Sequence, residues 1–343
     1  MQNKKYKYAV YIGRFQPFHN GHYYILDEAS KIAEKIILLI GSANLAKNIK
    51  NPFSYREREQ MIPDSINDVK IIKRRLDDCI NDNDWILNVQ KTISMLTNNT
   101  DDRLICLVGC NKDSSTYYLK NFFIWNIINF PKKFDVDASY IREIIFKRNN
   151  FINLISIPNK TKEFLLRWIN SKDYQNLKEE YEFIEKYKAQ FSNLPYPPTF
   201  FTTDAVVFCK GHILLLKRKF LPGKGLWALP GGFINVKKDI LTNCIDVLKK
   251  ETGIKIDKKK IRNSLIDSEI FDNPERSVRG RTITNAFLFI LKDIDLPEIK
   301  NTKSGDVRWV SFKDFFVYDY ETKMFEDHYF IITHFYLKKG FQI

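Results

Sequence analysis

The first 110 residues alternate short apolar runs with amphipathic stretches, and this alternation constrains the fold more than any other feature of the chain. The apolar runs have the length and β-branched content of buried strands; they lie at residues 8–13, 35–41, 69–74 and 103–109. Helical patterns separate or follow them, at about 21–35, 55–65, 84–97 and 161–190. Strand–helix alternation predicts an α/β fold with a parallel sheet and right-handed crossovers, with ligands at the carboxyl ends of the strands.

A proline-rich segment, SNLPYPPT at 192–199, divides the chain. Its prolines occupy three of four successive positions and favour an extended, semi-rigid linker. After it, the pattern changes to short strand-like runs interrupted by one helix at about 239–251. We therefore expect an α/β domain over 1–190, a linker over 191–199 and an α+β domain over 200–343.

The chain has 55 Lys and Arg residues and 41 Asp and Glu residues, which gives a net charge of +14. This positive charge favours an anionic partner. The basic residues form no long tract or repeat, which favours nucleotides over nucleic acid, although a nucleic-acid-binding regulator stays open as an alternative. No run resembles a membrane span or a secretory signal, so a cytoplasmic protein without membrane contacts is expected. The five cysteines lack metal-site spacing and are expected to be free thiols.

The segment GRFQPFHNGH, residues 13–22, follows the first predicted strand and leads directly into a helix. It places His19 and His22 at the helix N-terminus, where unpaired backbone N–H groups and the helix dipole attract phosphate. Gly13 allows the backbone to approach a ligand closely, and Arg14 adds a cation suited to phosphate oxygens. The segment therefore predicts a phosphate-binding site.

This segment contains the His-x-Gly-His signature of nucleotidyltransferases, and its full length resembles the archaeal-type nicotinamide mononucleotide (NMN) adenylyltransferases. Stretches similar to the same family follow at 41–62, 77–85, 107–115 and 136–144. The resemblance implies a Rossmann-like domain in which the NMN phosphate attacks the α-phosphorus of ATP, giving NAD and diphosphate, with Mg²⁺ on the phosphates. It implies no side-chain nucleophile, so that catalysis would rest on positioning and charge stabilisation.

The resemblance also implies roles for individual residues. The expected catalytic residues are His19, His22 and Arg14, with His22 stabilising charge on the transferred phosphoryl group. The expected ATP- and phosphate-binding residues are Gly13, Phe15, Lys50, Ser139, Ile141 and Arg142. Asn81 and Trp85 are expected to contact NMN, although a tryptophan that opens a helix also commonly packs into a core.

Two positions depart from the family pattern. Lys50 stands where Arg is frequent, which keeps the charge but loses the bidentate fork. Asp137 begins a motif, Asp137-Ala-Ser139, that in the family usually reads Ser-x-Thr. It places near the phosphates a negative charge that the sequence does not explain.

Residues 230–254, from PGGF to ETGI, resemble the box of the Nudix hydrolases: Gly, five residues, Glu, seven residues, Arg-Glu, apolar, any, Glu-Glu, any, Gly, apolar. The frame from Gly232 to Gly253 holds without a gap. The charged positions of the box are filled by Lys238, Asp246, Val247, Lys250 and Glu251, so that one of four glutamates remains. Since the box offers its carboxylates to Mg²⁺, hydrolysis is expected to be weak or lost. Asp239 is expected to cap the helix of the box.

The stretches at 224–233 and 271–289 resemble the ADP-ribose-cleaving Nudix domains that are fused to these adenylyltransferases. The expected pocket residues are Gly231, Gly232, Glu251, Arg276, Arg279 and Arg281, with Glu251 as the remaining candidate metal ligand. The arginines would meet a diphosphate or belong to a solvated loop, and the lysines of the box would replace the charge of the metal. Retained ADP-ribose pyrophosphatase activity, a nucleotide sensor and a dimerisation surface stay open for this domain. ATP, NMN, NAD and ADP-ribose are the expected ligands of a homo-oligomeric protein.

Overall fold

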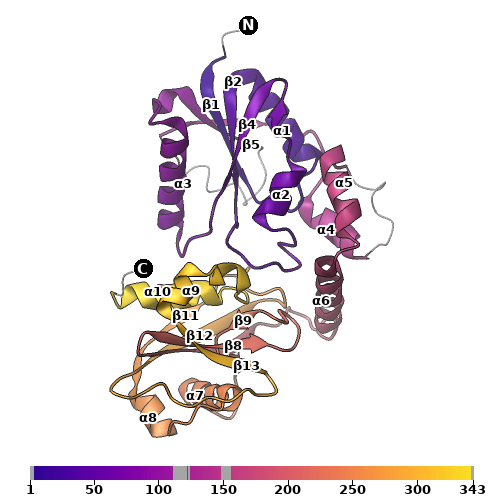
Figure 1. The fold of residues 1–343 in the computed structure, drawn as a ribbon. Coiled ribbons are helices and arrows are strands. Elements are labelled where there is room, and N and C mark those ends of the chain that lie inside the picture. Colours follow the sequence, from indigo (N-terminus) through magenta and orange to yellow (C-terminus); the bar gives the residue numbers. More distant parts are fainter. Residues whose placement is uncertain (1–3, 111–121, 123, 148–155, 341–343) are drawn as a thin grey trace. The chain divides into compact units, whose positions relative to one another are not determined.

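The computed structural model describes residues 4–110, 122, 124–147 and 156–340. The chain forms two compact units, Met1–Lys178 and Glu179–Ile343, each with its own sheet (Figure 1). The division lies inside helix α6 (Lys172–Ala189), ahead of the expected linker. It lies there because the second half of α6 packs with the second unit: Gly223 N–H donates to Glu180 Oε2 at 2.7 Å, and the Tyr187 and Phe200 rings are 5.7 Å apart.

The sheet of the first unit has six strands in the order β3-β4-β2-β1-β5-β6. Their bounds are β1 Tyr6–Gly13, β2 Ala33–Ile40, β3 Ser65–Ile66, β4 Val69–Arg75, β5 Ile105–Cys110 and β6 Asn126–Phe130. All neighbouring strands are parallel except β3 and β4. The predicted parallel sheet is confirmed, with β6 as an additional edge strand. Because β1 lies between β2 and β5, the carboxyl ends of these three strands are adjacent, where ligands of such sheets bind.

Helices cover both faces of this sheet (Figure 1). Their bounds are α1 Asn20–Ile32, α2 Tyr55–Met61, α3 Asp82–Thr97, α4 Ala138–Lys147, α5 Asn159–Trp168 and α6. On one face Val10 and Ile12 of β1 share a core with Val89 and Ile93 of α3, while α1 and α2 lie on the other side of the sheet. The single helical region predicted at 161–190 is two helices, since α5 ends before the turn at Asn170.

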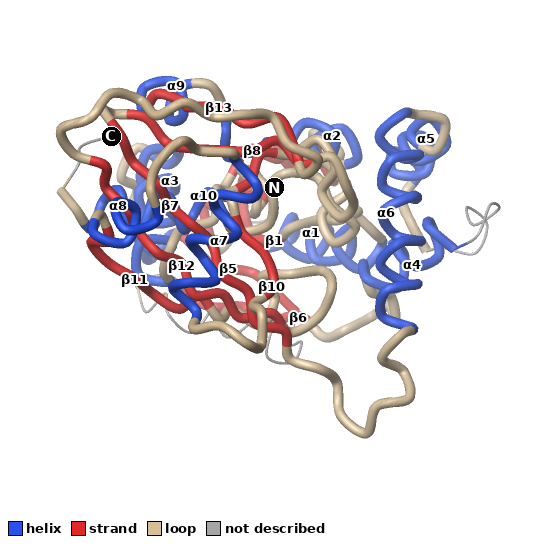
Figure 2. Tube along the Cα trace, turned by 90° about the horizontal axis from the view of Figure 1, so that it is seen from below, coloured by secondary structure: helices blue, strands red, loops and turns tan. Residues whose placement is uncertain are grey.

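The second unit is built on a mixed sheet in the order β11-β12-β7-β8-β13, with β10 beside β7 and β9 beside β8. Its strands are β7 Phe200–Cys209, β8 His212–Arg218, β9 Trp227–Ala228, β10 Gly231–Phe233, β11 Leu265–Phe271, β12 Thr282–Leu291 and β13 Gly305–Ser311. Its α-helices are α7 Ile240–Thr252, α8 Lys258–Asn263, α9 Phe312–Val317 and α10 His328–Lys338. Residues 190–199 contain no helix or strand and lead from α6 to β7 (Figure 2, tan).

Side chains alternate along β7 between two cores. Ala205 and Val207 pack with Cys244, Ile245 and Leu248 of α7 on one face. Residues Val206 and Phe208 pack with Ile331, Ile332 and Phe335 of α10 on the other face. This architecture confirms the predicted α+β domain, in which β9, β10, β11, α8, α9 and α10 are additional elements.

The five cysteines are free thiols, and Cys106, Cys209 and Cys244 are buried. Burial raises the pKa of Cys106 and of Cys244 to about 12, so both stay protonated at neutral pH. Within the described ranges, no helix combines the length and the hydropathy that a bilayer span requires.

Candidate active site

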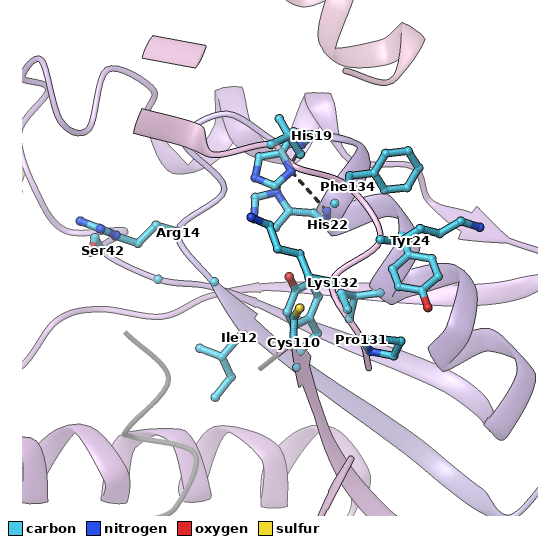
Figure 3. Close-up of a pocket in the computed structure, with 18 of the residues that line it drawn as sticks. Ile12, Arg14, His19, His22, Tyr24, Ser42, Cys110, Pro131, Lys132 and Phe134 are labelled. Carbon is cyan, nitrogen blue, oxygen red and sulfur yellow. Dashed lines mark hydrogen bonds between the residues drawn. The ribbon is translucent and has the colours of Figure 1, made fainter. Parts of the chain in front are cut away.

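Helix α1 begins with a reciprocal pair of hydrogen bonds between two histidines. The backbone N–H of His22 donates to Nδ1 of His19 at 3.4 Å, and the N–H of His19 donates to Nδ1 of His22 at 3.2 Å. The two rings stack with centroids 3.6 Å apart (Figure 3). This is a capping box in which imidazoles take the places that Ser or Thr and Glu usually fill. A ring nitrogen that accepts carries no proton, so each neutral ring has its proton on Nε2.

The turn before α1 depends on a close approach of backbone and ring. Phe15 is buried and has φ of +52°, a conformation uncommon for a non-glycine residue. A Cβ at Gly13 would lie 2.8 Å from the Phe15 ring, so a larger residue at 13 would displace the ring. The Phe15 ring in turn meets the His22 ring edge-on, with centroids 4.8 Å apart. Gly13 and Phe15 therefore position His22.

A cavity of about 510 Å³ lies beside the histidine pair, next to the carboxyl ends of β1, β2 and β5. Arg14 and Ser42 lie on one side of the pair, and Tyr24 and Phe134 lie on the other (Figure 3). The remaining polar lining comes from segments distant in sequence and includes Asp78, Trp85, Cys110, Lys132 and Lys133. This volume falls within the range of small-molecule sites.

Five predicted residues line this cavity: Gly13, Arg14, His19, His22 and Trp85. The Trp85 ring also packs against Phe122, with centroids 5.9 Å apart, so it serves the core as well. The other predicted residues of this unit are outside the lining: Phe15, Lys50, Asn81, Ser139, Ile141 and Arg142. Asn81 is the N-cap of α3, and its side-chain oxygen accepts from Asp84 N–H at 2.9 Å. Ile141 is fully buried.

The start of α4 explains Asp137. Its Oδ1 accepts from the backbone N–H of Ser139 at 2.5 Å, so the carboxylate caps the helix. Arg142, one turn later, donates to the Gln16 carbonyl at 2.8 Å and to Ser139 Oγ at 3.0 Å. Burial, together with the nearby Arg14, lowers the pKa of Arg142 to about 10, which leaves it charged at neutral pH. Arg142 therefore braces the loop that carries the histidines.

Arg58 of α2 has the same bracing role and was not predicted. Its side chain is 1% exposed and is enclosed by backbone carbonyls. It donates to the carbonyls of Arg14 at 2.7 Å, Gly41 at 2.5 Å, Ser42 at 3.2 Å and Ser54 at 3.3 Å. Burial lowers the pKa of Arg58 to about 10. The guanidinium thus joins the segments that follow β1 and β2 at the rim of the cavity. In the sequence, Arg58 could have been found as the arginine of the Glu-Arg pair in the stretch 41–62.

The box of the second unit contains an ion pair at its first charged positions. Lys238 Nζ and Lys258 Nζ each lie 2.5 Å from a carboxylate oxygen of Asp246. Lys238 and Asp246 occupy the Glu and Arg positions of the box, so the pair has reversed charges. Lys238 is thus paired with Asp246, and the hypothesis that the lysines of the box replace the charge of a metal stays a prediction. Asp239 caps α7 as predicted, accepting from Thr242 N–H at 2.9 Å.

Glu251 lies next to a second buried carboxyl group. Its Oε2 accepts from Gly231 N–H at 3.3 Å, and burial raises its pKa. A Cβ at Gly231 would lie 2.0 Å from Asp204 Oδ1, so the Asp204 carboxyl fills the space beside this glycine. Gly232 faces Val247 instead. In the described part of the chain, no three His, Cys, Asp or Glu side chains gather as metal ligands.

The three predicted arginines are all paired with acidic residues. Arg276 is buried and makes two hydrogen bonds to the Asp327 carboxylate, at 2.8 and 2.7 Å. Arg279 lies 3.5 Å from Glu326, and Arg281 lies 3.5 Å from Asp272. The side chain of Arg281 is 33% exposed, against 2% for Arg276, so Arg281 is the more accessible to a ligand. Arg276 belongs to the interior and not to a solvated loop.

Two families match the chain: cytidylyltransferase-like over residues 10–144 and the NUDIX domain over residues 200–334. A nicotinamide/nicotinic acid mononucleotide adenylyltransferase of Acinetobacter baylyi is 32% identical over 193 residues, which are 55% of this chain and 97% of that protein. The chain belongs to this adenylyltransferase family. In addition, it carries a fused NUDIX domain, so the resemblance stated from the sequence is confirmed.

A solved structure shares both units of this fused adenylyltransferase. The bifunctional NMN adenylyltransferase/ADP-ribose pyrophosphatase of Francisella tularensis is 34% identical and matches with a TM-score of 0.88, over 97% of this chain and 99% of that chain. A second structure of that protein, complexed with AMP and a manganese ion, matches with a TM-score of 0.87 at 33% identity. The nicotinamide-nucleotide adenylyltransferase of Methanocorpusculum labreanum is 43% identical over 63 residues, 18% of this chain and 38% of that protein.

Proposed function

We propose that the first unit forms NAD and diphosphate from NMN and MgATP in the cavity beside His19 and His22. The observation that carries this proposal is the reciprocal capping of the two histidines, which makes both rings neutral Nε2–H donors. Arg14 supplies a cation in the same cavity, and Trp85 supplies a flat surface for a pyridine ring. A basic net charge of +14 favours two substrates that both carry phosphate.

The proposed reaction needs no covalent intermediate. An oxygen of the NMN phosphate forms a bond to the α-phosphorus of ATP, while the bond from this phosphorus to the bridging oxygen breaks and diphosphate leaves. His22, half-buried at the cavity, donates its Nε2–H to an oxygen of the transferred phosphoryl group. His19, 2% exposed and stacked against it, holds that ring in place. Arg14 binds the phosphates, so the protein contributes positioning and charge stabilisation.

Magnesium enters this proposal as part of the nucleotide substrate. Asp78 is the one acidic side chain among the described residues of the lining, and a protein-held Mg²⁺ requires more oxygen ligands than that. The ATP phosphates therefore supply most of the ligands. Bound there, the ion neutralises charge that develops on the leaving diphosphate.

For the second unit we propose weak or absent hydrolase activity and retained binding of an ADP-ribose-like nucleotide. Support comes from Asp246, neutralised by two lysines, and from Val247 and Lys250 at ligand positions. Arg281 is the proposed contact for a diphosphate. The alternative, a truly bifunctional enzyme, is favoured by the match to the Francisella protein over both units. AMP release from ADP-ribose at ordinary enzymatic turnover would establish that alternative, and calorimetry with and without Mg²⁺ would measure binding.

Replacement of His22 by Ala tests the adenylyltransferase. We expect NAD formation to fall about 10³-fold, because the loss of one preorganised donor to a developing charge has an effect of this size. The protein should stay folded, since loss of a cap costs about 1 kcal/mol. His212→Ala in the second unit is the matched control and should form NAD normally. Near-normal turnover of the His22 variant would refute the assignment. The cytoplasmic location and the homo-oligomer stay predictions from the sequence.

A further inference from the structure

Asp78 is the one acidic side chain among the described residues that line the cavity of the first unit. It follows the end of β4, and three residues later Asn81 caps α3, whose fourth residue is Trp85. Asp78 and Trp85 thus reach the same cavity from one short segment. An acidic group in a site for phosphorylated substrates needs an explanation, since it opposes their charge.

The segment after β2 holds Asp78 in place. Asn44, which is buried, accepts from the backbone N–H of Asp78 at 2.9 Å and donates from its side chain to the Asp78 carbonyl at 3.1 Å. Ser42 donates to the carboxylate from its hydroxyl and from its backbone N–H. Ser42 makes these bonds with φ of +49°, a conformation that costs a non-glycine residue free energy and is concentrated at functional sites. The carboxylate is therefore a built feature of the cavity.

Two sets of groups act on the Asp78 carboxyl in opposite directions. Burial raises the pKa of this carboxyl, and the hydrogen bonds from Ser42 and the nearby Arg14 oppose that rise. The other positive group close by, Arg58, is enclosed by backbone carbonyls and is outside the lining. Arg14 lines the cavity and, in the proposed function, is neutralised by substrate phosphates.

The two forms of the mononucleotide differ in one group on the pyridine ring. NMN has a carboxamide with two N–H donors, whereas nicotinate mononucleotide has a carboxylate without donors. The name of the Acinetobacter relative covers both forms, so family membership leaves the choice open. A fixed carboxylate accepts a charge-assisted hydrogen bond from the amide, and it repels the acid in a site from which water is excluded.

We infer that Asp78 is the residue that selects NMN over nicotinate mononucleotide, an inference that rests on the proposed adenylyltransferase function. The ring stacks on Trp85 in both forms, so Trp85 contributes affinity without discrimination. The discrimination comes from the attraction of the amide and the repulsion of the acid at one fixed carboxylate. A site built to bond an N–H group rejects analogues that lack it far more strongly than an apolar site does.

The test is the ratio of kcat/KM for NMN to kcat/KM for nicotinate mononucleotide, with ATP in excess. We expect the unaltered protein to favour NMN by about 10²-fold or more, and Asp78→Asn to lower this ratio about 10²-fold. Asparagine keeps an oxygen that accepts from Ser42, so the site should persist. Asp77→Asn is the matched control: Asp77 pairs with Arg75 at 2.8 Å, is outside the lining, and should leave the ratio unchanged within threefold, about 0.7 kcal/mol.

An active Asp78→Asn variant that keeps the original ratio would overturn the inference, as would an unaltered protein that uses both forms equally. If Asp78→Asn does not fold, Asp78→Ser, which also removes the charge and keeps a polar oxygen, has to show the same fall in the ratio. Failure of the unaltered protein to form NAD from NMN would instead refute the proposed function. The two failures are therefore distinguishable in one set of assays.

Discussion

The two units differ in the charges that they bury beside their sites. In the first unit the buried ionic groups around the cavity include the guanidinium groups of Arg58 and Arg142, and burial lowers the pKa of each to about 10; the one acidic group of the described lining is Asp78. In the second unit the buried groups beside the box include three carboxyls, Asp204, Glu251 and Glu326, and burial raises the pKa of each.

This difference concerns what neutralises each charge. The hydrogen bonds of Arg58 go to backbone carbonyls, so its positive charge is solvated but not cancelled, and it adds to the potential that attracts phosphate. Three arginines of the second unit, Arg276, Arg279 and Arg281, instead pair with carboxylates, most closely in the bidentate pair of Arg276 and Asp327. The positive charge of the first unit therefore stays available to attract phosphate at the cavity, whereas carboxylates neutralise these arginines of the second unit.

The largest effect is expected from Arg58→Met. Loss of the guanidinium leaves several buried carbonyls without a donor, so the free energy of unfolding of the first unit should fall by about 3–5 kcal/mol. NAD formation should fall with it, because the segments after β1 and β2 lose their tie. Denaturant unfolding measures the change, and Arg56→Met, exposed on the same helix, is the control. A loss below 1 kcal/mol would show that the carbonyls do not depend on Arg58.

The second effect concerns the lost carboxylates of the box. The double replacement Val247→Glu and Lys250→Glu restores two of them on the face of α7 that carries Glu251. We expect Mg²⁺-dependent AMP release from ADP-ribose to rise about 10²-fold, since a hard cation then has ligands. Lys255→Glu, also exposed, controls for added negative charge. An unchanged rate would mean that another feature limits hydrolysis.

The third effect concerns Asp204, whose protonation is expected to make the free energy of unfolding depend on pH. Its raised pKa means that the folded state keeps a proton which the unfolded chain loses above about pH 4. Stability from this group is therefore present at low pH and is lost as the pH rises toward the folded pKa, by at most about 1.4 kcal/mol per pH unit. Relative to Asp204→Asn, the unaltered protein should lose unfolding free energy between pH 4 and pH 7. The exposed Asp293→Asn serves as the control. An unaltered protein that gains unfolding free energy relative to Asp204→Asn as the pH rises from 4 to 7 would contradict the prediction.

The smallest effect is expected from the reversed pair of the box. Lys238→Glu places two negative charges together and should reduce the unfolding free energy by about 0.5–1 kcal/mol, because the pair is partly exposed. The double variant Lys238→Glu and Asp246→Arg restores an ion pair in the order that the box describes. It should recover most of the loss in a double-mutant cycle, and additive losses would show that the two side chains do not interact.

The sequence predicted those parts of the fold that have a strong local period. Strands β1, β2, β4 and β5 and the histidine start of α1 have clear local patterns. By contrast, α10 was missed because its residues, HYFIITHFYLK, are apolar on most sides and show no helical period. Strand β6 was missed because it is a short edge strand with exposed side chains. Asp137 received its role as a cap only from the structure.

The site was predictable where one segment carries several functional residues, as Gly13, Arg14, His19 and His22 do. It was not predictable where the cavity is assembled from distant segments. Lys132 and Lys133 follow β6, and Asp78 depends on Asn44 and Ser42, thirty-four and thirty-six residues earlier. No local pattern marks such contacts, because the parallel sheet alone brings these segments together.

The course of α6 decides how this chain can be divided for biochemistry. A fragment that begins at Phe200, after the prolines, lacks Glu180, whose carboxylate accepts from Gly223 N–H, and lacks the Tyr187 ring that packs on Phe200. Without Glu180, the Gly223 N–H loses its acceptor. Arg218, whose guanidinium lies over the Phe325 ring, loses the negative charge of Glu180 nearby. A fragment that begins at Glu179 keeps these contacts. Recombinant halves should therefore be cut within the helix, and the proline segment belongs to the C-terminal half.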